Sequence, residues 1–194
     1  MRKVVFLVFA ASVLSCGGSG ASFPDGADVK AAQTKWCDAL AAASGQKEAW
    51  PSAGACHGVF PSASAGYVRA MTTCFQKRWG GVSDKSAGAG PVVQECSDEV
   101  VVEVGRQPGE DQSASLVDTR CARQKRCEKV ELAECKKGFA ALDAGQRALL
   151  TTVYNAGARA RIADCLSSSS CGDDEEKARD ACYKAETDKL IWLP

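Results

Sequence analysis

Few side chains in this 194-residue sequence have the chemistry of a catalytic group. The only histidine, His57, directly follows Cys56, and such a pair can supply a nucleophile and its base when the cysteine is a free thiol. A cysteine held in a disulfide has no thiolate to attack with, so a histidine beside it is an ordinary loop residue. Because Cys56 belongs to a set of repeatedly spaced cysteines, we expect a disulfide there and no catalytic residue.

The spacing of the cysteines argues against redox and metal chemistry. The sequence contains no Cys-x-x-Cys, which is the motif of thioredoxin-like exchange and of c-type haem attachment. Cys121 and Cys127 are six residues apart, as are Cys165 and Cys171, and zinc sites rarely use this spacing. We therefore expect neither a metal ion nor a cofactor.

Other catalytic signatures are also missing from the sequence. There is no Gly-x-Ser-x-Gly elbow and no Walker A loop. Four consecutive acids at 173–176 precede the last expected helix, where the helix dipole favours negative charge. We interpret them as solvated residues of a helix start and not as a glycosidase pair, so the sequence predicts a protein that is not an enzyme.

Two groups of side chains are candidates for contact with a partner. Arg120 and Arg123 lie on one face of an expected helix within a basic stretch, where they would suit an acidic partner or anionic lipid headgroups. Glutamates dilute this stretch, so a solvated helix face is the favoured interpretation, and no nucleic acid is expected. Trp50 and Trp79 lie in expected loops, where exposed rings can recognise a protein or a sugar, although core packing is the favoured interpretation for each ring.

Composition and periodicity indicate the elements that position these residues. The chain has 24 basic and 24 acidic side chains and 45% hydrophobic residues, which is typical of a globular protein. Three valines at 100–102 could begin a strand, but no run of alternating strands follows, so the sequence predicts an all-α fold. Apolar residues at three- and four-residue steps predict helices over 28–43 and 143–166. Pro91 at a first helical position predicts a helix over 91–104, and Ser115 with Asp118 resembles a capping signal for a helix over 115–137. Residues 65–79 are a further candidate, and a last helix follows 172.

The ten cysteines after Cys16 fall into two ordered sets. Cys-x-x-x-Phe occurs at Cys56 and again at Cys135, each time with a glycine inside, and the flanking cysteines follow in the same order. This order indicates two repeats, with a single ten-cysteine helical domain as the alternative. Each repeat, of about 75 residues, would bury little apolar surface, so we expect disulfides to compensate for a small core.

Three helices running up, down and up in the second repeat suggest a pairing of the cysteines. Only cysteines at similar heights can join, because bridged Cα atoms lie roughly 4.4–6.8 Å apart, and the repeat extends the pattern to the first half. The preferred pairs are Cys37–Cys74, Cys56–Cys96, Cys121–Cys171, Cys127–Cys165 and Cys135–Cys182. Pairing between neighbours, such as Cys37–Cys56 with Cys74–Cys96, is the main alternative.

The first sixteen residues have the features of an export signal. Two basic residues at 2–3 precede an apolar run at 4–14, which is shorter than the roughly 20 residues that span a bilayer. The run ends in Val-Leu-Ser-Cys at 13–16, and a Gly/Ser-rich stretch follows. An aliphatic residue three positions before a cysteine, with a small residue directly before it, resembles the lipobox of bacterial lipoproteins. An ordinary cleavable signal is the alternative.

With its alanine-rich helices and repeated cysteines, the whole chain resembles the cysteine-rich lipoproteins of bacteria. The resemblance implies removal of a signal peptide over 1–15, acylation of Cys16 and a flexible tether over 16–27. Gly17 stands where lipoproteins kept at the inner membrane typically carry aspartate, so the resemblance favours the outer membrane.

The sequence therefore predicts two helical modules, 28–104 and 115–194, joined by a turn-rich linker at 105–114. We expect a lipid-anchored protein of the cell envelope that acts as a disulfide-stabilised interaction module in an outer-membrane or surface complex. Membrane lipid and an envelope protein would be its partners. The first alternative is an accessory protein that binds envelope glycans through its loop aromatics, and the second is an envelope hydrolase or redox enzyme.

Overall fold

The computed structural model describes residues 26–44, 56, 59–85, 88–106, 112–172 and 174–191, and in these residues the fold is all-α, as predicted. The valines at 100–102 are helical, so the strand considered for them is wrong. One isolated bridge, between Ala63 and Tyr154, is the strand-like pairing in this part of the chain. The helices are α1 (Gly26–Ser44), α3 (Ala65–Gly80), α4 (Gly90–Arg106), α5 (Gln112–Glu128), α6 (Leu132–Ala141), α7 (Ala144–Leu150), α8 (Ala156–Ser168) and α9 (Glu175–Thr187).

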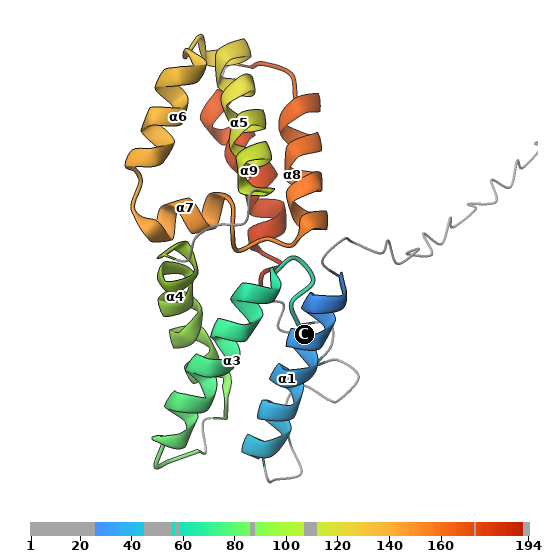
Figure 1. The fold of residues 1–194 in the computed structure, drawn as a ribbon, viewed down its shortest axis with the longest axis vertical. Helices are drawn as coiled ribbons and strands as arrows, with labels where there is room; N and C mark the ends of the chain where they lie inside the picture. Colours follow the sequence, from blue (N-terminus) through green and yellow to red (C-terminus); the bar gives the residue numbers. More distant parts are fainter. Residues whose placement is uncertain are drawn as a thin grey trace, which may run out of the picture.

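The helices form two tiers (Figure 1). The lower tier contains α1, α3 and α4, in which α1 packs against α3 and α3 against α4. The upper tier contains α5 to α9, in which α5 contacts α6 and α8, and α8 contacts α9. The tiers meet where α4 packs against α7. None of the described helices is both long and apolar enough to cross a membrane.

Side-chain caps fix where several helices begin. The Ser64 hydroxyl accepts a hydrogen bond from the backbone of Tyr67 at the start of α3, and Asn155 accepts one from Ala158 at the start of α8. Asp143 and Gln146 form a reciprocal capping box at the start of α7. These caps give hydrogen-bond acceptors to backbone N–H groups that would otherwise be unpaired at a helix N-terminus.

Two long helices expected from the sequence are each divided in two. The helix expected over 115–137 breaks after α5, where Lys129 adopts a φ of 61°, and the chain reverses into α6. The helix expected over 143–166 breaks between α7 and α8. The apolar pattern over 143–166 continues through the break between α7 and α8, because Ala148 and Ile162 lie in the same core, so this pattern does not reveal the turn. The capping pattern that predicts the helix over 115–137 marks only a helix start and carries no signal for the reversal at Lys129.

The second break exists because the backbone there pairs with the lower tier. The amide of Ser64 donates to the carbonyl of Val153 over 2.7 Å, and the amide of Asn155 donates to the carbonyl of Ser62 over 2.9 Å. A backbone that gives its hydrogen bonds to another segment cannot also continue a helix. Residues 62–64 and 153–155 therefore form a short seam between the tiers.

The core is continuous across the two tiers. In the lower tier Trp36 is fully buried, with its ring 5.2 Å from that of Phe60 and 5.3 Å from that of Phe75. The same apolar cluster extends through Val100 of α4 to Ala148 of α7. The two modules expected from the sequence thus share one hydrophobic core.

The linker expected at 105–114 is largely helical where the structure describes it. Gly105 and Arg106 belong to α4, and residues 112–114 belong to α5, while 107–111 lie outside the described residues. Gly105 packs so closely on α7 that a Cβ there would collide with the carbonyl of Ala144. The glycine serves close helix packing, whereas the sequence suggested a turn.

Five disulfides join the helices, and none is a preferred pair. The first half has neighbour pairing, which was the alternative. The preferred pairs Cys37–Cys74, Cys56–Cys96, Cys121–Cys171, Cys127–Cys165 and Cys135–Cys182 are therefore wrong. The observed pairs are Cys37–Cys56, Cys74–Cys96, Cys121–Cys135, Cys127–Cys171 and Cys165–Cys182.

The turn after α5 explains the error in the second half. An uninterrupted helix would hold Cys121 and Cys135 at opposite ends, but the reversal at Lys129 brings their Cα atoms to 5.6 Å. Cys127, near the end of α5, then meets Cys171 in the loop before α9. A chain with five such bridges folds in an oxidising, extracytoplasmic environment.

Candidate binding surfaces

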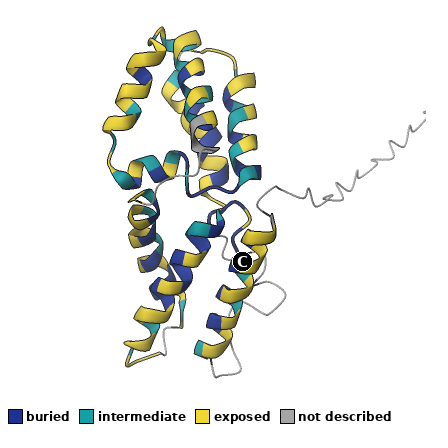
Figure 2. Ribbon diagram, viewed as in Figure 1, coloured by how far each residue is buried: buried dark blue, intermediate teal, exposed yellow. Residues whose placement is uncertain are grey.

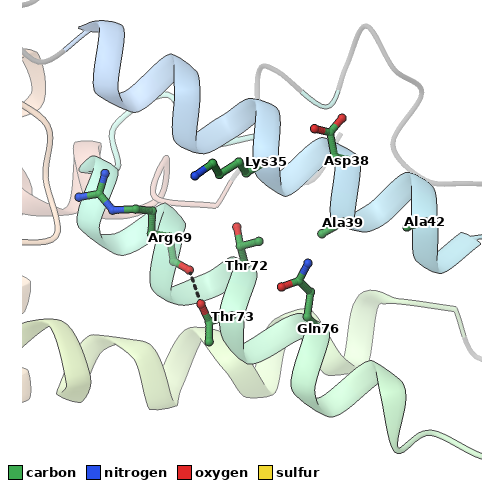
Figure 3. Close-up of a pocket in the computed structure, with 8 residues that line it drawn as sticks. All are labelled: Lys35, Asp38, Ala39, Ala42, Arg69, Thr72, Thr73 and Gln76. Carbon is green, nitrogen blue, oxygen red and sulfur yellow. Dashed lines mark hydrogen bonds between the residues drawn. The ribbon is translucent and has the colours of Figure 1, made fainter.

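A shallow groove of about 470 Å³ runs between α1 and α3 (Figure 3). Its floor includes Thr72, which is buried, and the small side chain of Ala39. The hydroxyl of Thr72 donates to the carbonyl of Val68 over 2.8 Å, which leaves its oxygen as an acceptor. The groove is lined by Lys35, Asp38, Ala39, Ala42, Arg69, Thr72, Thr73 and Gln76.

Two cations from different helices lie at one end of this groove. The side chains of Lys35 and Arg69 extend toward the same end, whereas the carboxylate of Asp38 points away from both (Figure 3). Within the described part of the chain, neither cation forms an ion pair. Two positive charges on facing helices suit an anionic group, and the lining residues include no histidine or cysteine that could act on it. The groove therefore has the chemistry of a binding surface.

A smaller recess of about 280 Å³ lies between α5 and α8. Alanines at 156, 160 and 163 and the buried Leu116 form much of its wall, with Arg159 at its side. Arg159 donates to the carbonyl of Tyr154, so this guanidinium already has an acceptor within the fold. The recess offers a ligand fewer polar groups than the groove between α1 and α3.

The basic residues of α5 have structural partners. Arg123 is only 1% exposed and forms an ion pair of 2.7 Å with Glu175, so both the possible partner contact and the solvated face are wrong for this residue. Arg126 donates to the carbonyls of Leu166, Ser167 and Ser169 at the end of α8. It therefore pairs carbonyls that α8 leaves free at its C-terminus.

Arg120 is half-buried and its guanidinium lies over the ring of Tyr183, 5.5 Å from the ring centre. This cation–π contact occupies the guanidinium group that the sequence suggested as a contact for a partner. Burial raises the pKa of the Tyr183 hydroxyl, although the charge of Arg120 opposes the shift. Arg120 and Arg123 thus pack within the upper tier, whereas Lys125, Arg126 and Lys129 are exposed.

The structure describes one of the two tryptophans expected in loops, Trp79, but not Trp50. Trp50 lies outside the described residues, so its role as a contact stays a prediction. Trp79 belongs to the last turn of α3, and its ring stacks on Phe75 at 5.7 Å. Its indole N–H donates to the carbonyl of Ala43, and Lys85 lies 5.1 Å from the ring centre. The expected loop position of Trp79 is wrong, because the residue is helical, but its ring packs against the core, as the favoured interpretation expected.

Three of the four acids expected at the start of the last helix lie there in the described structure. Asp174 caps α9 by accepting a hydrogen bond from Lys177, and Glu175 and Glu176 occupy its first turn. Asp173 lies outside the described residues, as does His57. Cys56 is bonded to Cys37, so its sulfur is not a nucleophilic thiolate.

One group of side chains has the spacing of metal ligands. The two sulfurs of Cys127 and Cys171 and a carboxylate oxygen of Glu175 all lie within 4.8 Å of one another. The two sulfurs are joined in a disulfide, and Glu175 is paired with Arg123, so none of the three is a free ligand. This group is better described as a disulfide beside an ion pair.

An ion pair between α8 and α9 lies beside the seam and is linked to the lower tier by one hydrogen bond. Glu186 of α9 is buried and accepts hydrogen bonds from Ser62 of the lower tier over 2.6 Å and from Arg161 over 2.6 and 2.8 Å. Burial opposes the ionisation of Glu186, but the hydrogen bonds from Arg161 and Ser62 and the positive charges of Arg161 and Lys189 outweigh it. They lower its pKa to about 2.

Comparison with known proteins gives no relative: no family model, no curated protein and no solved structure matches this chain. The candidate surfaces therefore rest on geometry alone. Sequence reasoning missed Lys35 and Arg69, because they are 34 residues apart and become neighbours only when α1 packs against α3. Only knowledge of the helix pairing could have indicated them.

Proposed function

We propose that this chain is an exported lipoprotein of the cell envelope that binds another envelope component and catalyses no reaction. The supporting observation is the use of the cysteines. Five disulfides pair ten of the eleven cysteines, and the one left over is Cys16. Cys16 is also the cysteine of the lipobox-like segment, where acylation requires a free thiol. Two or more acyl chains, each CH₂ contributing about 0.8 kcal/mol on burial, anchor a protein stably.

The groove between α1 and α3 is the surface we assign to the partner. Lys35 and Arg69 have no ion pair within the described residues, whereas Arg123 and Arg126 of α5 are engaged inside the fold. Charged rims raise the rate of association and select a partner of opposite charge. We therefore propose that the partner presents an acidic segment to this groove.

The anchor is tested by mass spectrometry and detergent phase partitioning of the protein after expression in a Gram-negative bacterium. We expect a mature chain that begins at an acylated Cys16 and partitions into the detergent phase. Cys16→Ser should move the protein to the aqueous phase. The matched control is the double variant Cys74→Ser with Cys96→Ser, which also removes cysteines but should leave partitioning unchanged. A wild-type chain with an unmodified Cys16 would exclude the anchor.

The binding surface is tested with a photo-cross-linking amino acid at position 76, in the groove, and at position 94, on the exposed side of α4. We expect an adduct with an envelope component from position 76 only. The double variant Lys35→Glu with Arg69→Glu should abolish it. Lys30→Glu with Lys77→Glu changes the same charge on the same two helices outside the groove and should retain it. Equal adducts in both double variants would exclude this groove as the contact.

A further inference from the structure

One of the five disulfides differs from the others in its exposure. Cys127 is half-buried and Cys171 is exposed, whereas every other bridge has at least one buried cysteine. The buried members of the other four bridges are Cys56, Cys74, Cys96, Cys121, Cys135 and Cys182. A thiolate in solution can therefore reach the Cys127–Cys171 bridge more easily than any other.

The surroundings of this bridge distinguish its two sulfurs. The buried guanidinium of Arg123 donates a hydrogen bond to the Sγ of Cys127 over 3.5 Å, while Sγ of Cys171 receives no such bond in the described structure. Arg123 is held in place by Glu175 at 2.7 Å and by Ser169 at 3.0 Å. An adjacent guanidinium stabilises a cysteine thiolate, so Cys127 is the better leaving group of the pair.

The charge of Glu175 opposes this effect but does not reverse the difference. Its carboxylate lies within 4.8 Å of both sulfurs and so disfavours a thiolate at either. The direct N–H contact from Arg123 favours Cys127 alone. The exposed sulfur is thus the one to be attacked, and the sulfur beside the arginine is the one to leave.

We propose that Cys127–Cys171 is a site of thiol–disulfide exchange with a dithiol reductant of the envelope. A thiolate of the dithiol attacks Sγ of Cys171, the Cys127–Cys171 bond breaks, and its electron pair leaves on Cys127 beside Arg123. The second thiol of the reductant loses its proton and attacks the reductant sulfur that is bonded to Cys171. The bond to Cys171 breaks, and the reductant leaves with its two sulfurs joined in a disulfide. Cys171 then takes a proton, and this chain has gained two electrons.

The fold around the bridge is built to survive its opening. The loop that carries Cys171 is also held by Arg126, which donates to the carbonyls of Leu166, Ser167 and Ser169, and by Arg123, which donates to Ser169 and Ser170. These hydrogen bonds do not depend on the disulfide. Opening and closing can therefore occur without unfolding, which a reversible exchange site requires.

The order of opening is tested by limited reduction of the purified mature protein with dithiothreitol, followed by alkylation and mass spectrometry of each cysteine. We expect Cys127 and Cys171 to become alkylated at least about tenfold faster than Cys74 and Cys96. Simultaneous opening of all five bridges, or earlier opening of another one, would overturn the proposal.

The direction of attack is tested with glutathione, which has one thiol and leaves a mixed disulfide. We expect the glutathione on Cys171 and the free thiol on Cys127. Glutathione found mainly on Cys127 would overturn the assigned roles of the two sulfurs.

The role of Arg123 is tested in the double variant Arg123→Met with Glu175→Gln, which removes both charges together and so leaves no buried charge unpaired. Loss of the stabilised leaving group should slow exchange at Cys171 several-fold, whereas simple loosening of the loop would accelerate it. Arg126→Met is the control, since it weakens the same loop without touching the sulfur, and should not slow exchange. Unchanged or faster exchange in the double variant would overturn the role of Arg123.

Discussion

The core of the lower tier contains a cluster of aromatic rings around Trp36. The upper tier instead buries the guanidinium group of Arg123 together with the groups that accept its hydrogen bonds. Trp36 and Arg123 are equally inaccessible, at 0% and 1% exposed. The rings of Phe60 and Phe75 contact the first, and Glu175 and Ser169 bind the second. The two tiers therefore reach a similar depth of burial through different chemistry.

Figure 2 shows the consequence for the upper tier, where α6 is mostly exposed. Cys135 is the buried residue of α6, and it is bonded to Cys121 of α5. In the lower tier α3 instead buries eight residues, among them Tyr67, Met71 and Phe75. Apolar packing supports the lower tier, and covalent and ionic links have a larger share in the upper tier. A disulfide typically contributes about 2–4 kcal/mol, which can replace a substantial apolar contact.

The largest effect should come from the aromatic cluster. Trp36→Ala removes a fully buried ring in contact with two others, and we expect a loss of about 3–5 kcal/mol in the free energy of unfolding. Urea denaturation monitored by circular dichroism, with the disulfides intact, measures it. Trp36→Phe keeps a ring and removes an indole N–H that has no acceptor in the described structure, so it should cost less. Equal costs for the two variants would show that ring packing does not dominate.

Breaking the ionic core of the upper tier should cost somewhat less. Arg123→Met leaves the carboxylate of Glu175, which is 14% exposed, without its partner, and we expect a loss of about 3 kcal/mol. The double variant Arg123→Met with Glu175→Gln should recover much of it, because no unpaired charge remains. The same denaturation series measures both. A double variant as unstable as the single one would mean that hydrogen bonds to Ser169 and Ser170 matter more than the charge.

These two centres also differ in how far the sequence predicted them. Trp36 lies on an apolar helical face that periodicity identifies directly, and the structure buries it. Arg123 appeared as a surface cation, because the sequence does not reveal that Glu175, 52 residues away, lies within 2.7 Å. Periodicity thus predicts burial of apolar side chains well and burial of paired charges poorly.

The disulfides show a similar limit. The predicted repeat equates Cys165 and Cys182 with Cys74 and Cys96, and both of these pairs are bonded. Cys121 and Cys171 have no counterpart in the first half, but they do not bond each other, since Cys121 is bonded to Cys135 and Cys171 to Cys127. The turn at Lys129 decides this pairing, and a single residue with positive φ leaves little trace in the pattern of apolar residues.

Two helical glycines, one at the junction between the tiers and one on an open helix face, should respond to alanine with opposite signs. Gly105 lies against the backbone of Ala144 in α7, so Gly105→Ala must separate α4 from α7, and we expect a loss of about 1–3 kcal/mol. Gly138 in α6 has no atom near its Cβ position, so Gly138→Ala should stabilise the protein by about 0.5–1 kcal/mol through helix propensity. Thermal unfolding of both variants measures the two signs. Stabilisation by Gly105→Ala would mean that α4 and α7 are not in close contact in solution.

The smallest effect we expect is a dependence of stability on acid at the seam. The folded-state pKa of Glu186 is about 2, below its ordinary value of 4.5, so its contribution is fully present above pH 4.5 and is lost as the pH falls toward 2. Arg161 and Lys189 are 44% and 49% exposed, and solvent therefore weakens their charges on Glu186. Glu186→Gln should flatten the loss of stability between pH 4.5 and 2, whereas Glu103→Gln, at an exposed position of α4, should not. Denaturation midpoints across this range test it, and an equal slope in both variants would show that Glu186 does not couple the tiers to pH.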